Sequence, residues 1–232
     1  MQAIILVGGL GLRLKSCLDN IPKALAEING KPFLFWMFDY LKKQGITKIV
    51  LATGHMSNKI ESLIGNNWDG IEIIYSIESK PLGTGGAIKK ALAQIDPKKG
   101  VFVFNGDTWL TIDLKSFAEE VKIADSKIGV ALAKVNNSSR YGHVNLKDDY
   151  IVKFLEKKMS SPGYINAGLY FLAKPFEISM PEFSKFSFED SVLIAESSNS
   201  KLFGYKNTSN FIDIGIPEDY KRAQKECLKW LF

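Results

Sequence analysis

The stretch Ala3-Ile4-Ile5-Leu6-Val7-Gly8-Gly9-Leu10-Gly11-Leu12-Arg13 decides how the chain is interpreted. Its apolar, β-branched beginning predicts a buried strand over residues 2–7. Three glycines then follow within four positions, and an arginine comes after them. Glycines let backbone N–H groups approach a ligand closely, and Arg13 offers a planar pair of donors that suits phosphate oxygens. The stretch therefore predicts a phosphate-binding loop at the end of a strand.

Two common phosphate-binding loops do not fit these residues. The Walker pattern requires Gly, four residues, and then Gly-Lys-Ser or Gly-Lys-Thr, which no stretch matches. The dinucleotide fingerprint requires a third glycine where Leu14 stands. Lys23, which follows Pro22, adds a second cation ten residues after Arg13. A flexible turn with a surface arginine remains the alternative explanation.

Composition narrows the class of protein. The chain has 232 residues, of which 46% are hydrophobic and 24% charged, as in soluble globular proteins. A net charge of +5 without a block of like charges gives no indication of nucleic-acid binding. The two cysteines, Cys17 and Cys227, form no CxxC pair, which favours reduced thiols and a cytoplasmic location. The sequence contains no apolar run of about 18 residues, so no membrane span is predicted.

Strand and helix signals alternate along the chain. This alternation predicts an α/β fold: a Rossmann-like, mostly parallel mixed sheet with helices on both faces. After the first strand, strands are expected at 48–52, 71–75, 101–104, 129–134, 142–146, 151–155, 165–172, 201–205 and 211–214. Helices are expected at 32–44, 57–64 with Ser57 as cap, 84–95 with Thr84 as cap, from Asp113 to about 124, 188–195, and from Pro217 to about 230. We expect one domain over 1–232, with a nucleotide-binding side at about 1–110 and a more mixed second half at about 111–232.

Two acidic residues stand out. Asp107 follows the apolar strand Val101–Phe104, and ligands of open α/β sheets bind beyond the carboxyl ends of such strands. Asp213 interrupts an apolar run, where a carboxylate needs a partner or a metal. Mg²⁺ is held by one or two carboxylates together with phosphate oxygens and water. We therefore hypothesise that Asp107 and Asp213 share one Mg²⁺, although a turn-forming role for Asp107 is an alternative.

Taken together, the motifs resemble those of the sugar-1-phosphate nucleotidyltransferases. Gly8-Gly9-Leu10-Gly11-Leu12-Arg13-Leu14 is similar to the signature loop of that family, and Pro22-Lys23 follows at the family's spacing. Further stretches occur in the family's order: Pro81-Leu82-Gly83-Thr84-Gly85-Gly86, Asn105-Gly106-Asp107, Tyr141-Gly142, Phe154-Leu155-Glu156-Lys157, Asn166-Ala167-Gly168, Asp213-Ile214-Gly215 and Pro217-Glu218-Asp219-Tyr220. The resemblance covers nearly the whole chain and implies the nucleotidyltransferase fold of the GT-A-like type. A chain of 232 residues leaves no room for the C-terminal β-helix of many members.

The resemblance also implies roles for individual residues. Arg13, Lys23, Asp107, Lys157 and Asp213 would be catalytic, with Mg²⁺ on Asp107 and Asp213. The nucleotide would be bound by Leu6, Gly8, Gly9, Gly11, Glu78, Pro81, Gly83 and Thr84. The sugar phosphate would be bound by Tyr141, Gly142, Glu156, Lys157, Asn166 and Gly168.

The implied reaction joins a nucleoside triphosphate to a sugar 1-phosphate and releases pyrophosphate. Lys31-Pro32-Phe33-Leu34 and the ending Phe211-Ile212-Asp213 most resemble the members that act on GTP and D-glycero-α-D-manno-heptose 1-phosphate to make a nucleotide-sugar for surface polysaccharide. Open alternatives are another member of the family (acting on mannose, glucose or muramic acid phosphates), a non-catalytic nucleotide-sugar sensor, and a nicotinamide-dependent oxidoreductase. A homodimer is possible, and no membrane or nucleic-acid partner is expected.

Overall fold

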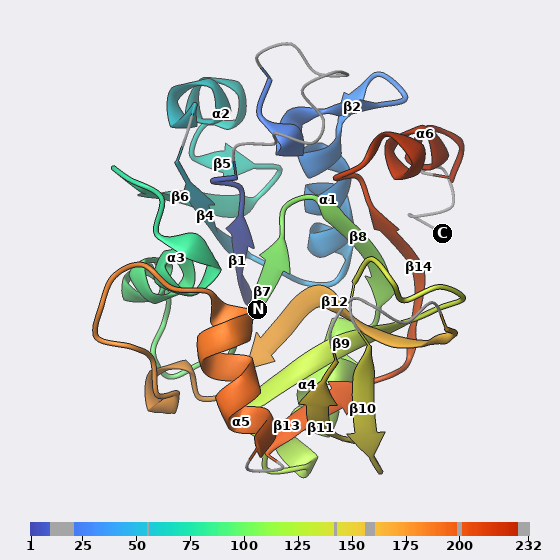
Figure 1. Ribbon diagram of the computed structural model, residues 1–232. Helices are drawn as coiled ribbons and strands as arrows, with labels where there is room; N and C mark the ends of the chain where they lie inside the picture. The colour runs from blue at the N-terminus through green and yellow to red at the C-terminus, as the bar shows by residue number, and fades with distance from the viewer. Residues whose placement is uncertain (10–20, 55, 142, 156–160, 199–200, 227–232) are drawn as a thin grey trace.

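The chain is built around one large mixed sheet. The computed structural model describes residues 1–9, 21–54, 56–141, 143–155, 161–198 and 201–226. Within these residues the sheet has the strand order β10-β11-β13-β9-β12-β7-β1-β4-β6-β5 (Figure 1). In chain order its strands are β1 (Gln2–Leu6), β4 (Lys48–Thr53), β5 (Asn67–Trp68), β6 (Ile71–Ile77), β7 (Val101–Asn105), β9 (Ile128–Val135), β10 (Val144–Lys147), β11 (Tyr150–Phe154), β12 (Gly163–Leu172) and β13 (Leu202–Tyr205).

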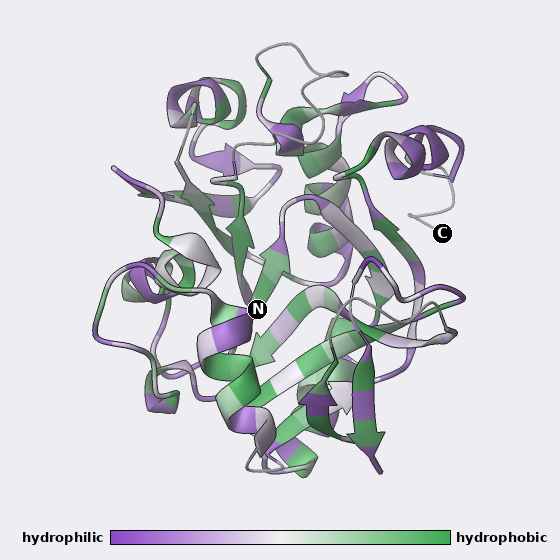
Figure 2. Cartoon of the chain, in the orientation of Figure 1, coloured by the Kyte–Doolittle hydropathy of each residue, from purple (hydrophilic) through white to green (hydrophobic). Residues whose placement is uncertain are grey.

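Helices cover both faces of this sheet, as the alternation of signals predicts. They are α1 (Phe33–Lys43), α2 (Ser57–Ile64), α3 (Gly83–Ala91), α4 (Leu114–Ile123), α5 (Ile194–Ser198) and α6 (Pro217–Glu226). Alternate residues of β1 belong to different cores: Ala3 and Ile5 pack with α1, α2 and α4, whereas Ile4 packs with α3. The hydrophobic residues gather on the central strands, and α6 is mostly hydrophilic (Figure 2).

One antiparallel strand brings the two halves of the chain together. β7, β1, β4 and β6 are mutually parallel, and β13 runs parallel to β9. β12 lies between β7 and β9 and is antiparallel to both. Because Leu169 pairs with Phe104, the residues that precede Leu169 lie beyond the carboxyl end of β7. The second half of the chain thus reaches the end of the sheet at which the parallel strands of the first half terminate.

A second, smaller sheet is a two-stranded antiparallel ribbon, and the sequence does not predict this pairing. It pairs β8 (Thr108–Ile112) with β14 (Thr208–Asp213). The sequence predicts a strand at 211–214 but none directly after Asp107, because a five-residue strand that follows a turn without an intervening loop leaves no separate signal. A two-residue hairpin, β2 (Glu27–Ile28) with β3 (Lys31–Pro32), precedes α1.

Two of the predicted helix caps are wrong. Residue Met56, in a left-handed conformation with φ 63°, precedes α2, and Ser57 is the first helical residue. Leu82 precedes α3, and Thr84 lies inside the helix. The cap at Asp113 is confirmed, since its carboxylate accepts hydrogen bonds from the N–H groups of Lys115 and Ser116 at 2.9 and 3.0 Å.

The helix predicted at 188–195 is present in a different form. Residues 189–193 form a π-helical turn, which α5 continues.

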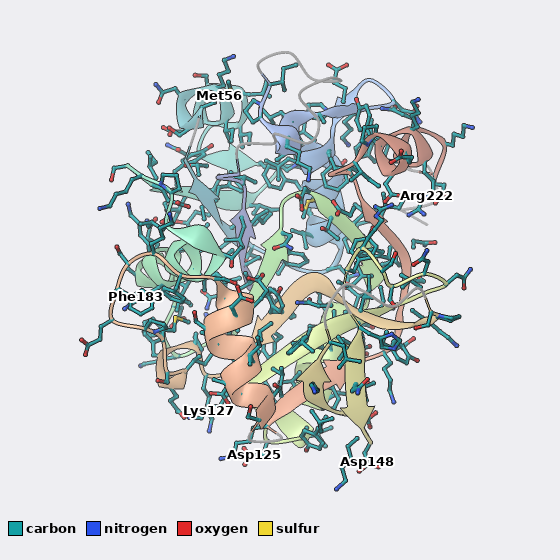
Figure 3. All side chains as sticks on the ribbon, in the orientation of Figure 1. Met56, Asp125, Lys127, Asp148, Phe183 and Arg222 are labelled. Atoms are coloured by element: carbon teal, nitrogen blue, oxygen red, sulfur yellow. The ribbon has the colours of Figure 1, made fainter. Side chains whose placement is uncertain are left out.

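Met56, Asp125 and Asp148, all with positive φ, lie in turns at the rim of the molecule (Figure 3). Among the described residues, no helix has the length and apolar character that crossing a membrane requires.

Candidate active site

The ends of β1 and β7 lie side by side and form the floor of the site. Leu6 is paired with Asn105, and the Gly106 N–H donates to the Leu6 carbonyl at 2.9 Å. A Cβ on Gly106 would lie 2.6 Å from that carbonyl oxygen, so only glycine allows the approach. Gly8 and Gly9 continue from β1 at this same edge, and Gly9 is exposed.

Asp107 and Asp213 converge as the sequence predicts, although 106 positions separate them. Asp107 directly precedes β8, and Asp213 ends β14, where it pairs with Thr108. The Ile214 N–H also donates to the Asp107 carbonyl at 3.0 Å. The β8–β14 ribbon therefore fixes the two carboxylates at one place.

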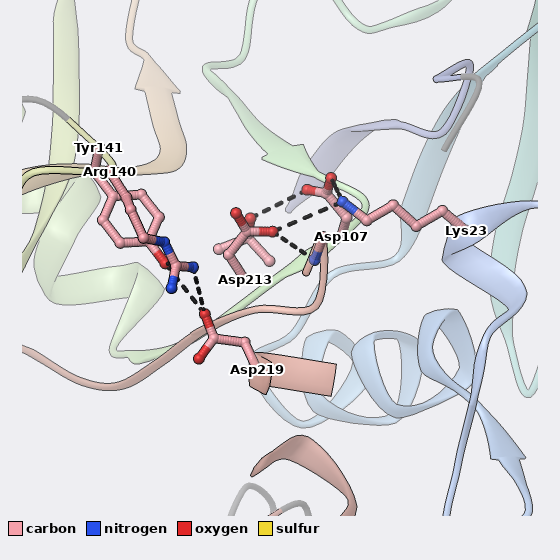
Figure 4. Close-up of polar contacts among 8 residues, drawn as sticks. Lys23, Asp107, Arg140, Tyr141, Asp213 and Asp219 are labelled. Carbon is pink, nitrogen blue, oxygen red and sulfur yellow. Dashed lines mark hydrogen bonds and ion pairs between the residues drawn. The ribbon is translucent and has the colours of Figure 1, made fainter. Parts of the chain in front are cut away.

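Lys23 joins these carboxylates and completes a cluster of three charges. Its ammonium group contacts Asp107 Oδ2 and lies 3.7 Å from Asp213 Oδ1 (Figure 4). The Lys23 side chain is only 12% exposed, which shields this pairing from water. Lys23 opens a short 3-10 helix whose next residues, Ala24 and Leu25, are buried and anchor it. We call Lys23, Asp107 and Asp213 the charged cluster.

The charged cluster is a donor set that suits Mg²⁺. Two carboxylates already share one cation there, the Lys23 ammonium. Among the described residues, no group of three or more His, Cys, Asp or Glu side chains could enclose a metal. A magnesium ion at two carboxylates takes its remaining ligands from water and phosphate, which is its usual preference in proteins.

Next to the cluster lies a second polar group, of which sequence reasoning named Tyr141 but missed Arg140 and the contact role of Asp219. Arg140 donates to Asp219 Oδ2 at 2.9 Å and to the hydroxyl of Tyr141 at 3.1 Å (Figure 4). The Asp219 side chain is 11% exposed and that of Arg140 48%. Burial and the charge of Asp219 raise the pKa of Tyr141 to about 12, so its hydroxyl stays protonated. Arg140 precedes the Tyr-Gly motif, and that adjacency was the available signal.

Glu78, a residue predicted to bind the nucleotide, lies beside Gly8. A Cβ on Gly8 would be 3.1 Å from Glu78 Oε1. The other carboxylate oxygen accepts a hydrogen bond from the Leu82 N–H at 2.9 Å, which ties Glu78 to residues 81–86. This stretch consists of two loop residues and the first turn of α3, and we call it the loop 81–86. Burial raises the pKa of Glu78, and the Leu82 hydrogen bond opposes part of that rise.

The glycines of that loop have a structural cause that the sequence does not reveal. Gly83 has φ +73°, and a Cβ there would lie 2.5 Å from the Phe186 carbonyl oxygen. Gly85 and Gly86 donate backbone N–H groups to the same oxygen at 3.0 and 3.4 Å. The Thr84 hydroxyl is bonded to Glu189 at 2.5 Å. The loop thus packs against the segment 184–188; base contacts of Pro81, Gly83 and Thr84 stay predictions.

Asn166 and Gly168 form a bulge at the carboxyl end of β7. The register of β12 against β9 shifts between Asn166 and Tyr170, and Gly168 adopts φ +71°. A Cβ on Gly168 would collide with the Asn105 side chain. The predicted sugar residues therefore stand next to Asn105, two positions from Asp107.

Five of the predicted site residues lie outside the described residues: Gly11, Arg13, Gly142, Glu156 and Lys157. Of those described, the structure brings Lys23, Asp107 and Asp213 into contact and puts Leu6 and Gly8 at the same sheet edge.

Comparison with known proteins settles the family. The family model described as Nucleotidyl transferase matches residues 2–229. The chain belongs to the nucleotidyl transferase family. Within this nucleotidyl transferase family, it is 44% identical over 231 residues to "D-glycero-alpha-D-manno-heptose 1-phosphate guanylyltransferase" of Aneurinibacillus thermoaerophilus, covering 100% of both chains. It is 45% identical over 221 residues to the protein of that name in Campylobacter jejuni subsp. jejuni, covering 95% of this chain and 97% of the relative.

Solved nucleotidyl transferase structures agree with the fold described above. HddC from Yersinia pseudotuberculosis complexed with GMP-PN superposes with a TM-score of 0.82 at 36% identity, covering 97% of this chain and 98% of HddC. The resemblance drawn from the motifs and the expected mixed sheet flanked by helices are thus confirmed.

Proposed function

We propose that this nucleotidyl transferase moves GMP from GTP to D-glycero-α-D-manno-heptose 1-phosphate, giving GDP-heptose for surface polysaccharide and releasing pyrophosphate. The proposal is supported by two relatives of that name at 44% and 45% identity over nearly the full chain. We assign the nucleotide to the side at about 1–110 and the sugar phosphate to the side at about 111–232.

The charged cluster carries the proposal. An oxygen of the sugar phosphate attacks the α-phosphorus of GTP, and the bond from that phosphorus to the bridging oxygen of pyrophosphate breaks. The attacking oxygen is already anionic, so the reaction needs no strong base, but it brings two anions together. Catalysis then consists of positioning and charge neutralisation. A buried lysine beside two carboxylates, next to a glycine loop, suits that task.

Each residue of the cluster has a part in this scheme. Asp107 and Asp213 would hold Mg²⁺, which supplies positive charge next to the α-phosphate. Lys23 neutralises charge in the same region, and it is held ready by the carboxylates that it contacts. Arg13 at the departing pyrophosphate and Lys157 at the incoming phosphate remain predictions from the family motifs. Arg140, whose side chain is exposed and paired with Asp219, would add a guanidinium for the sugar phosphate.

The chemistry of Glu78 supports guanine as the base. An ionised carboxylate only accepts hydrogen bonds. Guanine offers two donors on one edge, N1–H and the N2 amino group, whereas uracil and thymine offer one donor between two carbonyls. Glu78 lies beside Gly8 and keeps acceptor capacity after its bond from Leu82. A carboxylate at this position therefore favours guanine over the two pyrimidines.

A pyrophosphate-release assay tests the proposal. Four nucleoside triphosphates are combined with heptose, mannose, glucose and N-acetylmuramic acid 1-phosphates, with and without Mg²⁺. GTP with the heptose phosphate and Mg²⁺ should give the highest kcat/KM. Asp107→Asn and Asp213→Asn should each lower it by about 10²–10³-fold. Preference for another pair would overturn the substrate assignment, and nucleotide-sugar binding without pyrophosphate release would identify a non-catalytic sensor.

A further inference from the structure

A partly buried chain of polar side chains connects the loop 81–86 with the bulge 166–168, and Glu189 is its centre. Thr84 and Ser187 donate their hydroxyls to Glu189 Oε2 at 2.5 and 3.0 Å. Tyr170 donates its hydroxyl to Glu189 Oε1 at 3.1 Å. No ion pair to Glu189 occurs among the residues that the structure describes. Within the described residues, the side-chain groups that stabilise this carboxylate are the three hydroxyl donors.

The direction of every hydrogen bond in this chain is fixed. Thr84 Oγ1 accepts from the Phe188 N–H at 2.9 Å, and Ser187 Oγ accepts from the Asp190 N–H at 3.1 Å. The Tyr170 hydroxyl accepts from Asn166 Nδ2 at 3.0 Å. Each hydroxyl therefore accepts a bond from elsewhere and gives its single proton to Glu189. A carboxylate accepts all three, whereas an amide has only one acceptor oxygen.

The two ends of the chain lie on the two substrate sides. At one end, Thr84 belongs to the loop whose Gly85 and Gly86 N–H groups are bonded to the Phe186 carbonyl. At the other end, Asn166 Oδ1 accepts from the Gly168 N–H at 2.9 Å and so closes the bulge. Tyr170 is 1% exposed, and burial with the neighbouring Glu189 charge raises its pKa well above the usual value. Its hydroxyl is therefore a permanent donor.

We propose that Glu189 is a positioning residue that holds the nucleotide loop and the sugar bulge at a fixed distance, so that the two bound phosphates meet in line. The inference rests on the proposed function only for which side takes which substrate. Misplacement of reacting groups by about 1 Å costs on the order of 10²-fold in rate. Loosening this link should therefore lower kcat, while each substrate still binds its own side.

Amide hydrogen exchange tests the link without any substrate. Glu189→Ala should speed exchange about tenfold or more at both ends, at Gly85 and Gly86 and at Gly168. Thr84→Val should do so only at the loop, and Tyr170→Phe only at the bulge. Glu177→Ala is the matched control, because Glu177 is an exposed glutamate with surface lysine partners, and it should change neither end. Loosening of one end only, or of neither, in Glu189→Ala overturns the proposal.

Kinetics supplies the second readout. At saturating substrates, Glu189→Ala should lower kcat about tenfold or more. In calorimetry, the Kd for GTP should change less than about threefold, and the binding stoichiometry should stay the same. Glu189→Gln, which keeps one acceptor oxygen, should recover part of kcat. A raised Kd with unchanged kcat contradicts the positioning role. Should Glu189→Ala not fold, Thr84→Val and Tyr170→Phe decide the matter, because each must lower kcat while loosening only its own end. Inactivity of the wild type with GTP and the heptose phosphate would refute the proposed function and leave the exchange result standing.

Discussion

At Gly215 the lack of a side chain leaves the space that the charged cluster uses. A Cβ there would lie 2.6 Å from Asp213 Oδ1 and against the Lys23 ammonium. The Gly215 N–H also donates to Asp213 Oδ1 at 2.8 Å, which orients that carboxylate. The backbone at Gly215 does not have positive φ, so it can accommodate an alanine. The methyl group of that alanine would press against the charged cluster.

Gly215→Ala should therefore reduce activity and spare the fold. We expect kcat/KM to fall about tenfold or more, because the added methyl displaces Lys23 and Asp213. The melting temperature should change by less than about 3 °C. Ser209→Ala, an exposed change on β14, the strand that ends two residues before Gly215, is the control and should leave both unchanged. Full activity of Gly215→Ala would show that the cluster tolerates displacement.

Glu78 gives a prediction about pH and stability. Its pKa is raised by burial in the folded protein, so the stability that this shift contributes is present below the ordinary glutamate pKa and lost as pH rises through the raised value. At neutral pH the ionised carboxylate is therefore a cost that Glu78→Gln removes. Thermal melts should show the variant more stable than wild type at about pH 7.5 and not at about pH 4. An advantage that grows on acidification would contradict this sign.

The residue scale also shows what sequence reasoning can find. Asp213 was found because a carboxylate inside an apolar run is difficult to explain without a partner. Asp107 was found because ligands bind beyond the carboxyl ends of parallel strands, and Lys23 because it follows Pro22 ten residues after Arg13. Thr84 was misread as a helix cap because its true partner, Glu189, is 105 residues away. Local residue types predict local hydrogen bonds, and they carry no information on a partner that only the tertiary fold supplies.

Among the elements, α4 begins at the one predicted cap that the structure confirms. Asp113 binds two N–H groups of the first turn, which otherwise lack partners inside the helix. Those hydrogen bonds, first of all the one from Ser116, lower the pKa of Asp113. The helix buries Leu114 and Phe117 against the sheet, so its start is coupled to the core.

Asp113→Ala should destabilise the protein by about 0.5–2 kcal/mol in chemical unfolding at neutral pH. Because the folded pKa is lowered, the contribution of Asp113 exists above its unfolded pKa and vanishes as pH falls through the folded one. The difference between variant and wild type should therefore shrink in acid. Glu119→Ala, an exposed change on the same helix, is the control and should stay within about 0.5 kcal/mol.

The main strands were predictable because apolar, β-branched runs such as Ala3–Val7 and Val101–Phe104 are buried on both faces. The position of β12 was not, since an antiparallel strand inserted between β7 and β9 has the same apolar pattern as a parallel one. The ribbon of β8 and β14 escaped for a similar reason: pairing partners that are far apart in sequence leave no local signal.

Across the whole molecule, Asp219 ties the first turn of α6 to Arg140, 79 residues earlier. Replacing Asp219 by asparagine removes the charge that holds the guanidinium. We expect the KM for the sugar phosphate to rise about fivefold or more with a smaller change in kcat, since the role proposed for Arg140 is to bind substrate and not to react. Initial-rate kinetics checks this, with the exposed neighbour Glu218→Gln as control. An unchanged KM would remove Arg140 from the binding site.

The pairing of β8 with β14 has a consequence for biosynthesis. The two carboxylates of the charged cluster, Asp107 and Asp213, are made 106 residues apart and come together only through this ribbon. When the first half of the chain has emerged from the ribosome, the glycine loop, Lys23 and Asp107 have been made. The strand that positions Asp213 has not. Since domains fold as units during translation, a nascent chain completes the charged cluster only after β14 has been made, and termination before Asp213 leaves a polypeptide without that cluster.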